Sequence, residues 1–302
     1  MSQSFFTYAS GNKYLNLAFT LARSYLFHNK EEIEFYIISN CYFKLPRDLK
    51  LKIKKIIISK ELAGYGLEFK LNLNLIAPTE ESIFIDADSV IYGSIYFLFQ
   101  EFGKKKSSLN VIGTLVNEGE WVDEHIPTLM SEFQLSYVIR YCGAFYYLKK
   151  GKLIDEIFSF AHELYSARKF QKHKHYINEE PLLAISMSKY AVEPIVDNGN
   201  IWSDLGQYQS GSSLSVFKGS AFQNLPGFKY KFWLPTGIYS PLILHMGSSV
   251  YFKDPWLFEY FRLKFWLLFK LSPNSIEFII SFFIKPIYKL LKFLRQLIGL
   301  KR

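Results

Sequence analysis

Short apolar runs alternate with longer stretches in which apolar residues recur every three or four positions. The short runs predict buried strands, and the longer stretches predict helices with one apolar face. Early in the chain this pattern predicts strands at residues 4–9, 34–39, 54–58 and 82–85, and a helix at residues 14–28. Ser10, Gly11 and Asn12 form the turn that ends the first strand.

The later pattern is less regular but continues the alternation. It predicts strands at residues 110–114, 142–147 and 240–245, and helices at residues 153–166 and after residue 178. Strands that alternate with helices predict an α/β domain whose mostly parallel sheet is covered on both faces. Such sheets bind ligands at the carboxyl ends of their strands, so functional residues are expected there.

Residues 256–302 differ from the rest of the chain because they are aromatic, aliphatic and basic. They carry a net charge of +7 out of the total of +9. Their apolar residues recur at helical spacing with Lys and Arg between them, which predicts helices lying in the headgroup plane of an anionic membrane. We therefore expect a globular domain at residues 1–255 and a membrane-associating tail at residues 256–302. The alternative is that these residues pack on the domain.

Composition and charge narrow the classes of protein to consider. Apolar residues make up 49% and charged residues 21%, which excludes a disordered chain. Because residues 1–255 are nearly neutral, nucleic acid is not an expected partner. No phosphate-binding loop or dinucleotide fingerprint follows a predicted strand. The two cysteines, Cys41 and Cys142, indicate neither a disulfide framework nor a zinc site, and favour a reducing compartment.

The sequence also suggests a location. The first residues lack the basic and apolar regions of a secretory signal, and no run reaches the ~18 apolar residues of a spanning helix. With the basic tail, this predicts a cytoplasmic protein that lies on the inner face of a membrane.

Two carboxylates follow the strand predicted at residues 82–85. Asp86 and Asp88, separated by Ala87, would point the same way from an extended backbone. Two close negative charges repel each other unless a cation or a proton neutralises them. Carboxylate oxygens suit Mg²⁺ or Mn²⁺, with substrate phosphates completing the coordination. The alternative is a solvated turn with two acids.

A second candidate cluster follows the strand predicted at residues 240–245. His245 ends that strand, and Gly247 would let the backbone approach a metal or phosphate closely. Lys253 could meet a diphosphate. Taken singly, His245 could equally be a core residue and Lys253 an ordinary surface lysine.

These segments together resemble a known family. Residues 85–88 (IDAD), 245–247 (HMG) and 253–256 (KDPW) resemble the D-x-D and H-x-G…K-P-W signatures of GT-A glycosyltransferases, most of all those of family eight. The resemblance extends in motif order over roughly residues 4–256. It implies a UDP-sugar donor, transfer with retention, and Mn²⁺ held by Asp86, Asp88 and His245. Mg²⁺ in place of Mn²⁺ is the alternative that the carboxylate ligands allow. We expect a saccharide or lipid-linked saccharide acceptor, and membrane attachment favours the lipid-linked one.

Other positions match the family one at a time. Tyr8, Ala9, Ser10 and Tyr14 resemble the first-strand turn that holds the base and ribose, although the usual acid of that turn is missing. Lys70 matches a basic residue near the diphosphate and sugar. Residues 142–144 resemble the family's N-x-G-V stretch, with Tyr141 in place of the Asn.

The stretch Asn178-Glu179-Glu180 resembles the D-Q-D that contacts the donor sugar, with changed side chains. Glu179 or Glu180 would orient sugar hydroxyls, and a nucleophile role for either is open. The segment at residues 253–256 carries one residue more than K-P-W.

Two rival functions remain. An Asp-x-Asp after an apolar strand is also typical of haloacid-dehalogenase-type Mg²⁺ phosphatases, which need a later acidic pair, and Asp197 and Asp204 lack the usual local pattern for it. The altered first-strand turn also allows a catalytically degenerate sugar-nucleotide-binding protein.

Overall fold

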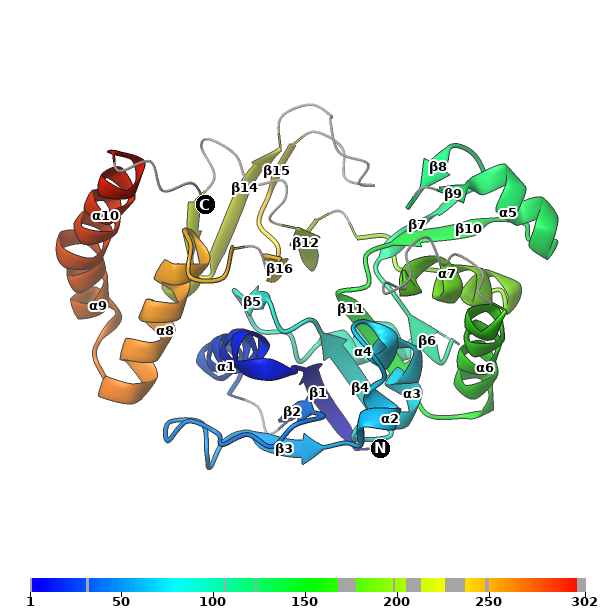
Figure 1. The fold of residues 1–302 in the computed structure, drawn as a ribbon, viewed down its shortest axis with the longest axis horizontal. Helices are drawn as coiled ribbons and strands as arrows, with labels where there is room; N and C mark the ends of the chain where they lie inside the picture. Colours follow the sequence, from blue (N-terminus) through cyan, green and yellow to red (C-terminus); the bar gives the residue numbers. More distant parts are fainter. Residues whose placement is uncertain are drawn as a thin grey trace.

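The computed structural model describes residues 2–30, 33–105, 107–122, 124–167, 178–197, 199–204, 213–225, 237–247 and 250–297. Its central sheet has six strands in the order β3-β2-β1-β4-β11-β6 (Figure 1). The three pairs from β3 to β4 are parallel, and β11 runs antiparallel to both β4 and β6. The bounds are β1 (Gln3–Tyr8), β2 (Glu34–Ser39), β3 (Lys54–Ile57), β4 (Glu81–Ile85), β6 (Leu109–Asn110) and β11 (Phe145–Lys149). The predicted α/β class is confirmed.

Alternating side chains of the central strands enter two hydrophobic cores. Phe5 and Ile83 belong to the first core, whereas Phe6 and Phe84 belong to the second. The helices that pack into the first core include α1 (Gly11–His28) and α8 (Trp256–Phe269), and those that pack into the second include α6 (Lys152–Ser166) and α7 (Glu179–Lys189). The sheet is therefore covered on both faces, as the sequence predicted.

A small second sheet continues from the end of β4. Here β5 (Ser89–Ile91) pairs with β16 (Ile243–His245), which also pairs with β12 (Trp202–Asp204). Between β3 and β4 lie α2 (Lys60–Ala63), η1 (Glu68–Asn72) and α3 (Leu73–Ile76). The other elements are α4 (Leu98–Gly103), β7 (Gly113–Val116), β8 (Glu120–Trp121), β9 (Glu124–His125), α5 (Ile126–Phe133), β10 (Val138–Tyr141), β13 (Ser213–Ser215), η3 (Val216–Lys218), β14 (Ser220–Leu225) and β15 (Gly237–Tyr239).

Two predicted strands have the wrong extent. The run at residues 110–114 divides between β6 in the central sheet and β7, which pairs with β10. The strand predicted at residues 142–147 begins only at Phe145, and residues 142–144 join β10 to β11. In both places the backbone stays buried while it passes from one sheet to another. Apolar composition reports that burial but not the change of sheet.

Helix α8 is part of the domain rather than of a separate tail. Its residues Trp256, Leu263 and Leu267 belong to the same core as β1 and α1. Its buried Glu259 accepts from the Val216 backbone at 3.0 Å and from Arg262 Nη1 at 2.8 Å. The boundary predicted after residue 255 therefore falls inside a packed unit.

The last helices differ from α8 in what they expose. α9 (Pro273–Ile279), the π-helical stretch η5 (Ile280–Ile284) and α10 (Lys285–Leu297) lie at one end of the molecule (Figure 1). Ile276 and Ile280 are buried and cluster with Phe258 of α8. The large exposed apolar side chains here are Phe278, Phe282, Phe283, Ile287, Leu290, Leu291, Phe293 and Leu294. Within the described residues, no helix combines the length and apolar character needed to cross a bilayer.

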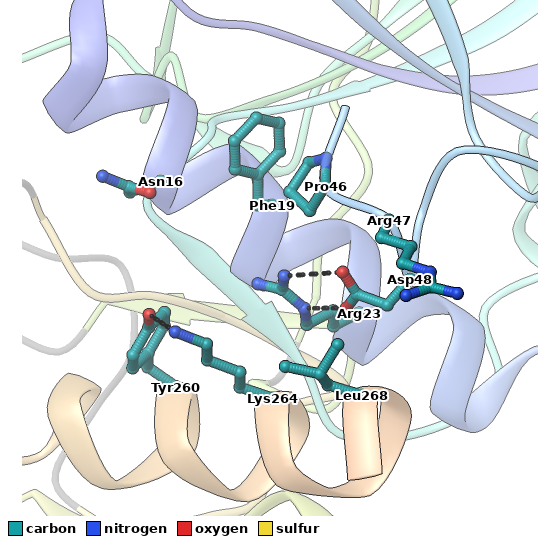
Figure 2. A pocket seen from close by; sticks show the side chains of 9 residues that line it. All are labelled: Asn16, Phe19, Arg23, Pro46, Arg47, Asp48, Tyr260, Lys264 and Leu268. Carbon is teal, nitrogen blue, oxygen red and sulfur yellow. Dashed lines mark hydrogen bonds and ion pairs between the residues drawn. The ribbon is translucent and has the colours of Figure 1, made fainter. Parts of the chain in front are cut away.

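A pocket of about 280 Å³ lies where α8 meets α1 and residues 46–48 (Figure 2). Arg23 Nε lies 2.7 Å from Asp48 Oδ2, and Lys264 Nζ donates to the Tyr260 hydroxyl at 2.8 Å. None of the residues lining it belongs to the predicted site. These pairings satisfy the polar groups along the seam where α8 docks.

The burial of α8 predicts a clear contrast between two leucines. Leu263 of α8 is 0% exposed and Leu291 of α10 is 53% exposed. We expect Leu263→Ala to lower the free energy of unfolding by about 2–5 kcal/mol, because it leaves a cavity in the main core. The matched Leu291→Ala should change it by no more than about 0.5 kcal/mol. Urea denaturation of both variants measures the difference, and equal small effects would contradict the assignment of α8 to the core.

Candidate active site

The ends of β1 and β4 create the position for a ligand. β1 lies between β2 and β4 and is parallel to both. The chain continues from β1 to β2 and β3 on one side and then crosses to β4 on the other side, so the direction of strand addition reverses at β1. Open α/β sheets bind ligands at such a switch point, outside the carboxyl ends of the strands. Phe6 pairs with Phe84, so Tyr8 and Asp86 follow at the same edge.

The two carboxylates sit in a turn, not on an extended strand. The Ser89 amide donates to the Asp86 carbonyl at 3.0 Å, which closes a turn through Ala87 and Asp88 before β5 begins. The expectation of an extended backbone is therefore wrong, although the two side chains still converge. Asp86 also donates its backbone N–H to the Ala144 carbonyl at 2.9 Å, so the turn is tied to the residue just before β11.

His245 reaches this turn because β16 pairs with β5. His245 lies opposite Ser89, and the Met246 amide donates to the Asp88 carbonyl at 2.9 Å. Its Nε2 lies 3.1 Å from Asp88 Oδ1. On the other edge of the ring, Nδ1 lies 2.9 Å from Asp204 Oδ2.

Asp204 joins the candidate site, although sequence reasoning gave it no role beside His245. A carboxylate at the second ring nitrogen fixes the orientation of a histidine, as it does for metal-ligating histidines generally. The chain contains no local motif linking Asp204 to His245, because the two residues meet only through the parallel pairing of β12 with β16.

Lys70 connects the acidic turn to α7. Its buried Nζ lies 3.0 Å from Asp86 Oδ2 and 3.2 Å from Glu179 Oε1, and it donates to the Gly143 carbonyl at 2.7 Å. Lys70 and Glu179, predicted from distant parts of the sequence, thus share one network with Asp86.

Gly143 is required by how closely α7 approaches. Glu180 Oε1 accepts from the Gly143 amide at 2.7 Å. A Cβ on Gly143 would lie 2.9 Å from Glu179 Oε1 and 3.0 Å from the Tyr146 hydroxyl. The backbone there can approach both glutamates only because it has no side chain.

The acids of the site differ in the direction of their pKa shifts: the pKa of Asp86 and that of Glu179 are raised, whereas the pKa of Asp88 is lowered. Burial raises the pKa of Asp86, and the Lys70 charge offsets that rise only in part. Burial alone would also raise the pKa of Asp88, but the charge and hydrogen bond of His245 lower it. Burial alone would lower the pKa of His245, yet the neighbouring Asp88 and Asp204 raise it well above its usual range. Burial raises the pKa of Glu179, against the opposing effect of Lys70.

The residues present fit a divalent ion. One ligand atom each from Asp86, Asp88 and His245 lies within 4.8 Å of the others, a spread that a single ion can bridge. Two carboxylates and an imidazole that is oriented by a second carboxylate form a donor set compatible with Mn²⁺.

The predicted first-strand turn lies beside this cluster. Tyr8 stacks on Phe69 with ring centroids 4.1 Å apart, and the Ser10 hydroxyl donates to Asn40 Oδ1 at 2.8 Å. Ala9 donates to the Ile38 carbonyl at 2.9 Å, and Tyr14 of α1 is exposed. The turn therefore presents hydroxyl and amide groups where the resembled family has an acid.

Tyr141 shows why its position departs from the family pattern. It is buried among apolar residues, and its hydroxyl lies 3.1 Å from that of Tyr146. Its side chain therefore fills the core instead of offering an amide to a ligand.

The other two predicted residues lie after β16. Gly247 has a φ of 72°, in the left-handed region that favours glycine. Lys253 is exposed, in the turn that precedes α8, and its backbone N–H donates to the Val250 carbonyl at 2.7 Å. A contact of Lys253 with a diphosphate stays a prediction.

Comparison with solved structures identifies the fold. No family model matches the chain, and no curated protein sequence does. The galactosyltransferase LgtC, in complex with donor and acceptor sugar analogs, superposes with a TM-score of 0.50 at 14% identity, over 80% of this chain and 86% of that one. The chain has the GT-A fold. Mouse xyloside xylosyltransferase 1 gives 0.48 at 11% identity, over 82% and 99% of the two chains.

The GT-A fold leaves the phosphatase reading without support. That reading needs a later acidic pair at the metal, and Asp197 is committed elsewhere. Its carboxylate accepts from the backbone amides of residues 200, 201 and 202 at 2.8–3.0 Å. Asp204 is likewise engaged with His245.

The environment of Glu180 predicts a pH-dependent stability difference. Burial and the charge of Glu179 raise the pKa of Glu180 from 4.5 to about 7. The folded state holds this proton more tightly than the unfolded state, so the free energy of unfolding falls as pH rises between those two values. Glu180→Gln removes that loss and keeps an oxygen that can accept from Gly143.

We therefore expect the variant to gain about 1–3 kcal/mol relative to the wild type between about pH 5 and about pH 8. Urea denaturation at a series of pH values measures this gain. A stability difference that is constant or shrinks with rising pH would contradict it.

Proposed function

We propose that this chain transfers a sugar from a nucleotide-sugar donor, with UDP as the expected nucleoside diphosphate. The acceptor is a saccharide or lipid-linked saccharide, and retention of configuration is the expectation carried by the family resemblance. One observation carries the proposal: Asp86, Asp88 and His245 converge within 4.8 Å at the carboxyl end of a central strand of a GT-A fold.

In this proposal the three converging residues hold Mn²⁺ or Mg²⁺. Bound there with a nucleotide-sugar, the ion would neutralise the negative charge that develops on the diphosphate as the sugar leaves. Asp86 and Asp88 supply hard oxygen ligands, and His245 supplies a nitrogen. Asp204 acts as a positioning residue, because its contact with Nδ1 holds the opposite nitrogen, Nε2, toward the turn.

Lys70, Glu179 and Glu180 form the side of the site that would face the donor sugar. Lys70 is a fixed, desolvated cation beside Asp86, which suits it to stabilise a departing diphosphate. Glu179 and Glu180 lie in the first turn of α7, where they can accept from sugar hydroxyls. Lys253 is assigned to the diphosphate on the resemblance alone.

The first-strand turn is proposed to receive the nucleoside. Tyr14 offers an exposed ring, Tyr8 stacks on Phe69 beneath the turn, and Ala9 and Ser10 offer a close backbone approach at the end of β1. The hydrogen-bonded side chains of Ser10 and Asn40 stand where the resembled family has an acid. Recognition of the base would therefore depend on polar but uncharged groups.

We also propose that α9, η5 and α10 attach the protein to an anionic membrane, on its cytoplasmic face. Their exposed apolar side chains adjoin the cations Lys285, Lys289, Lys292 and Arg295, and the described part of this segment after Glu277 contains no acid. Apolar insertion combined with several cations is the combination that binds negatively charged bilayers. This surface favours a lipid-linked acceptor.

The metal assignment predicts distinct effects for four variants. Asp88→Asn should abolish Mn²⁺-dependent hydrolysis of UDP-sugars. His245→Ala and Asp204→Asn should raise the Mn²⁺ concentration for half-maximal rate, by roughly 10–100-fold for Asp204→Asn, because outer-shell partners contribute that much to metal affinity. Lys253→Ala should lower turnover at unchanged metal dependence. Release of UDP from a panel of UDP-sugars measures all four.

Asp155→Asn on the exposed side of α6 is the matched control and should behave as the wild type. Activity that resists EDTA, or that survives in Asp88→Asn, would contradict the proposal. Stabilisation of the protein by aluminium fluoride but not by UDP with Mn²⁺ would favour the phosphatase. Binding of UDP and Mn²⁺ without hydrolysis or transfer would favour a degenerate binding protein.

The membrane proposal predicts flotation with anionic vesicles that high salt reverses. Replacing Lys285, Lys289, Lys292 and Arg295 by Gln should weaken binding by roughly a hundredfold or more, at ~1 kcal/mol for each cation. Replacing four exposed lysines of the domain, Lys44, Lys50, Lys52 and Lys60, removes the same charge and should weaken it far less. Equal losses in the two variants would indicate attraction by net charge alone.

A further inference from the structure

A second group of residues able to hold a metal ion lies on the far edge of the His245 ring. Cys142 Sγ, a carboxylate oxygen of Asp204 and a ring nitrogen of His245 all lie within 4.8 Å of one another. They come from three places: the turn between β10 and β11, the end of β12 and the end of β16. Pairing of β12 with β16 and the bond from Lys70 to the carbonyl after Cys142 tie all three to the site.

This group differs in chemistry from the Asp86 and Asp88 side. The hard carboxylates there suit Mg²⁺ or Mn²⁺, whereas a thiolate is a soft ligand that selects ions such as Zn²⁺ and Cd²⁺. A Cys, a His and an Asp are three protein ligands of the kinds that zinc takes, which leaves a fourth position for water.

We propose that Cys142, Asp204 and His245 form a site for a thiophilic divalent ion, and that an ion bound there competes with Mn²⁺ for His245. On binding, the Cys142 thiol releases its proton and the sulfur forms a bond to the ion. Asp204 exchanges the hydrogen bond that it accepts from Nδ1 for a bond to the ion. His245 binds the ion through Nδ1 and keeps its one remaining ring proton on Nε2, which then cannot bind Mn²⁺, so Mn²⁺ affinity falls.

The site therefore makes the enzyme sensitive to zinc. Binding of the ion is independent of the proposed glycosyl transfer, whereas inhibition of turnover rests on it. The experiment must separate these two, so its first readouts use no donor.

Cd²⁺ is the probe, because Cd–thiolate bonds absorb in the ultraviolet. The chelator-treated full chain should take up one Cd²⁺ with thiolate absorption. Cys142→Ala should lose this absorption, and Cys41→Ala should keep it, because Cys41 neighbours Ser39 and lies in neither group of metal ligands found among the described residues. Absence of the band in the wild type, or its loss only in Cys41→Ala, would overturn the proposal.

The competition is measured by the signal of free Mn²⁺ in electron paramagnetic resonance. Zn²⁺ should displace Mn²⁺ from the wild type, and Cys142→Ala should require at least roughly tenfold more Zn²⁺, because loss of even an outer-shell partner costs that much. Displacement at the same Zn²⁺ concentration in both proteins would mean that zinc simply replaces Mn²⁺ at Asp86 and Asp88, and would overturn the proposal.

Turnover provides the last readout. Cys142→Ala should keep Mn²⁺-dependent hydrolysis and lose most of its sensitivity to zinc. If cadmium binding and displacement occur as expected but no variant hydrolyses a donor, the proposed function fails and the ion site stands. If hydrolysis occurs but cadmium gives no thiolate band, the ion site fails and the proposed function stands.

Discussion

The repulsion between Asp86 and Asp88 constrains the structure around them. Both carboxylates occupy one tight turn at the end of a buried strand, where little water is present to screen them. The fold compensates with two basic side chains: Lys70 beside Asp86 and His245 beside Asp88. Each of them also contacts a further acid, Glu179 for Lys70 and Asp204 for His245. The network that stabilises the turn is therefore the same one that shapes the candidate site.

Much of the architecture was accessible from the sequence because the signals there are local. The run around Phe84 is apolar, short and flanked by polar residues, and β4 follows it closely. The strands predicted at residues 34–39 and 54–58 were placed by similar local patterns, and β2 and β3 match them within one residue. The single strand predicted at residues 110–114 was wrong, because the chain stays buried where it passes from one sheet to the next. Hydrophobicity alone could therefore not mark the end of β6.

The site residues show the same contrast between local sequence signals and tertiary contacts. Asp86, Asp88 and His245 could be proposed because each ends or closely follows an apolar strand, and parallel or paired strand ends collect at one edge. Asp204 could not, because its role depends on the register of β12 against β16, which no residue pattern encodes. The burial of Tyr141 is similar: only the packing around it shows that the side chain turns into the core. The basic, aromatic composition of α8 likewise resembles that of α10, yet Leu263 is buried and Leu291 is not.

The seam between α8 and α1 has a consequence for the proposed membrane attachment. α1 begins at Gly11, directly after the turn at Ser10, and α8 begins directly after the segment that contains Lys253. The Asn16 amide also donates to the Tyr251 hydroxyl at 2.9 Å. In the proposed membrane attachment, α10 would thus be joined to the candidate active site through packed helices instead of a slack tether. The protein would then work at a set height and tilt, and the length of an acceptor's glycan would decide whether its reactive end reaches the donor.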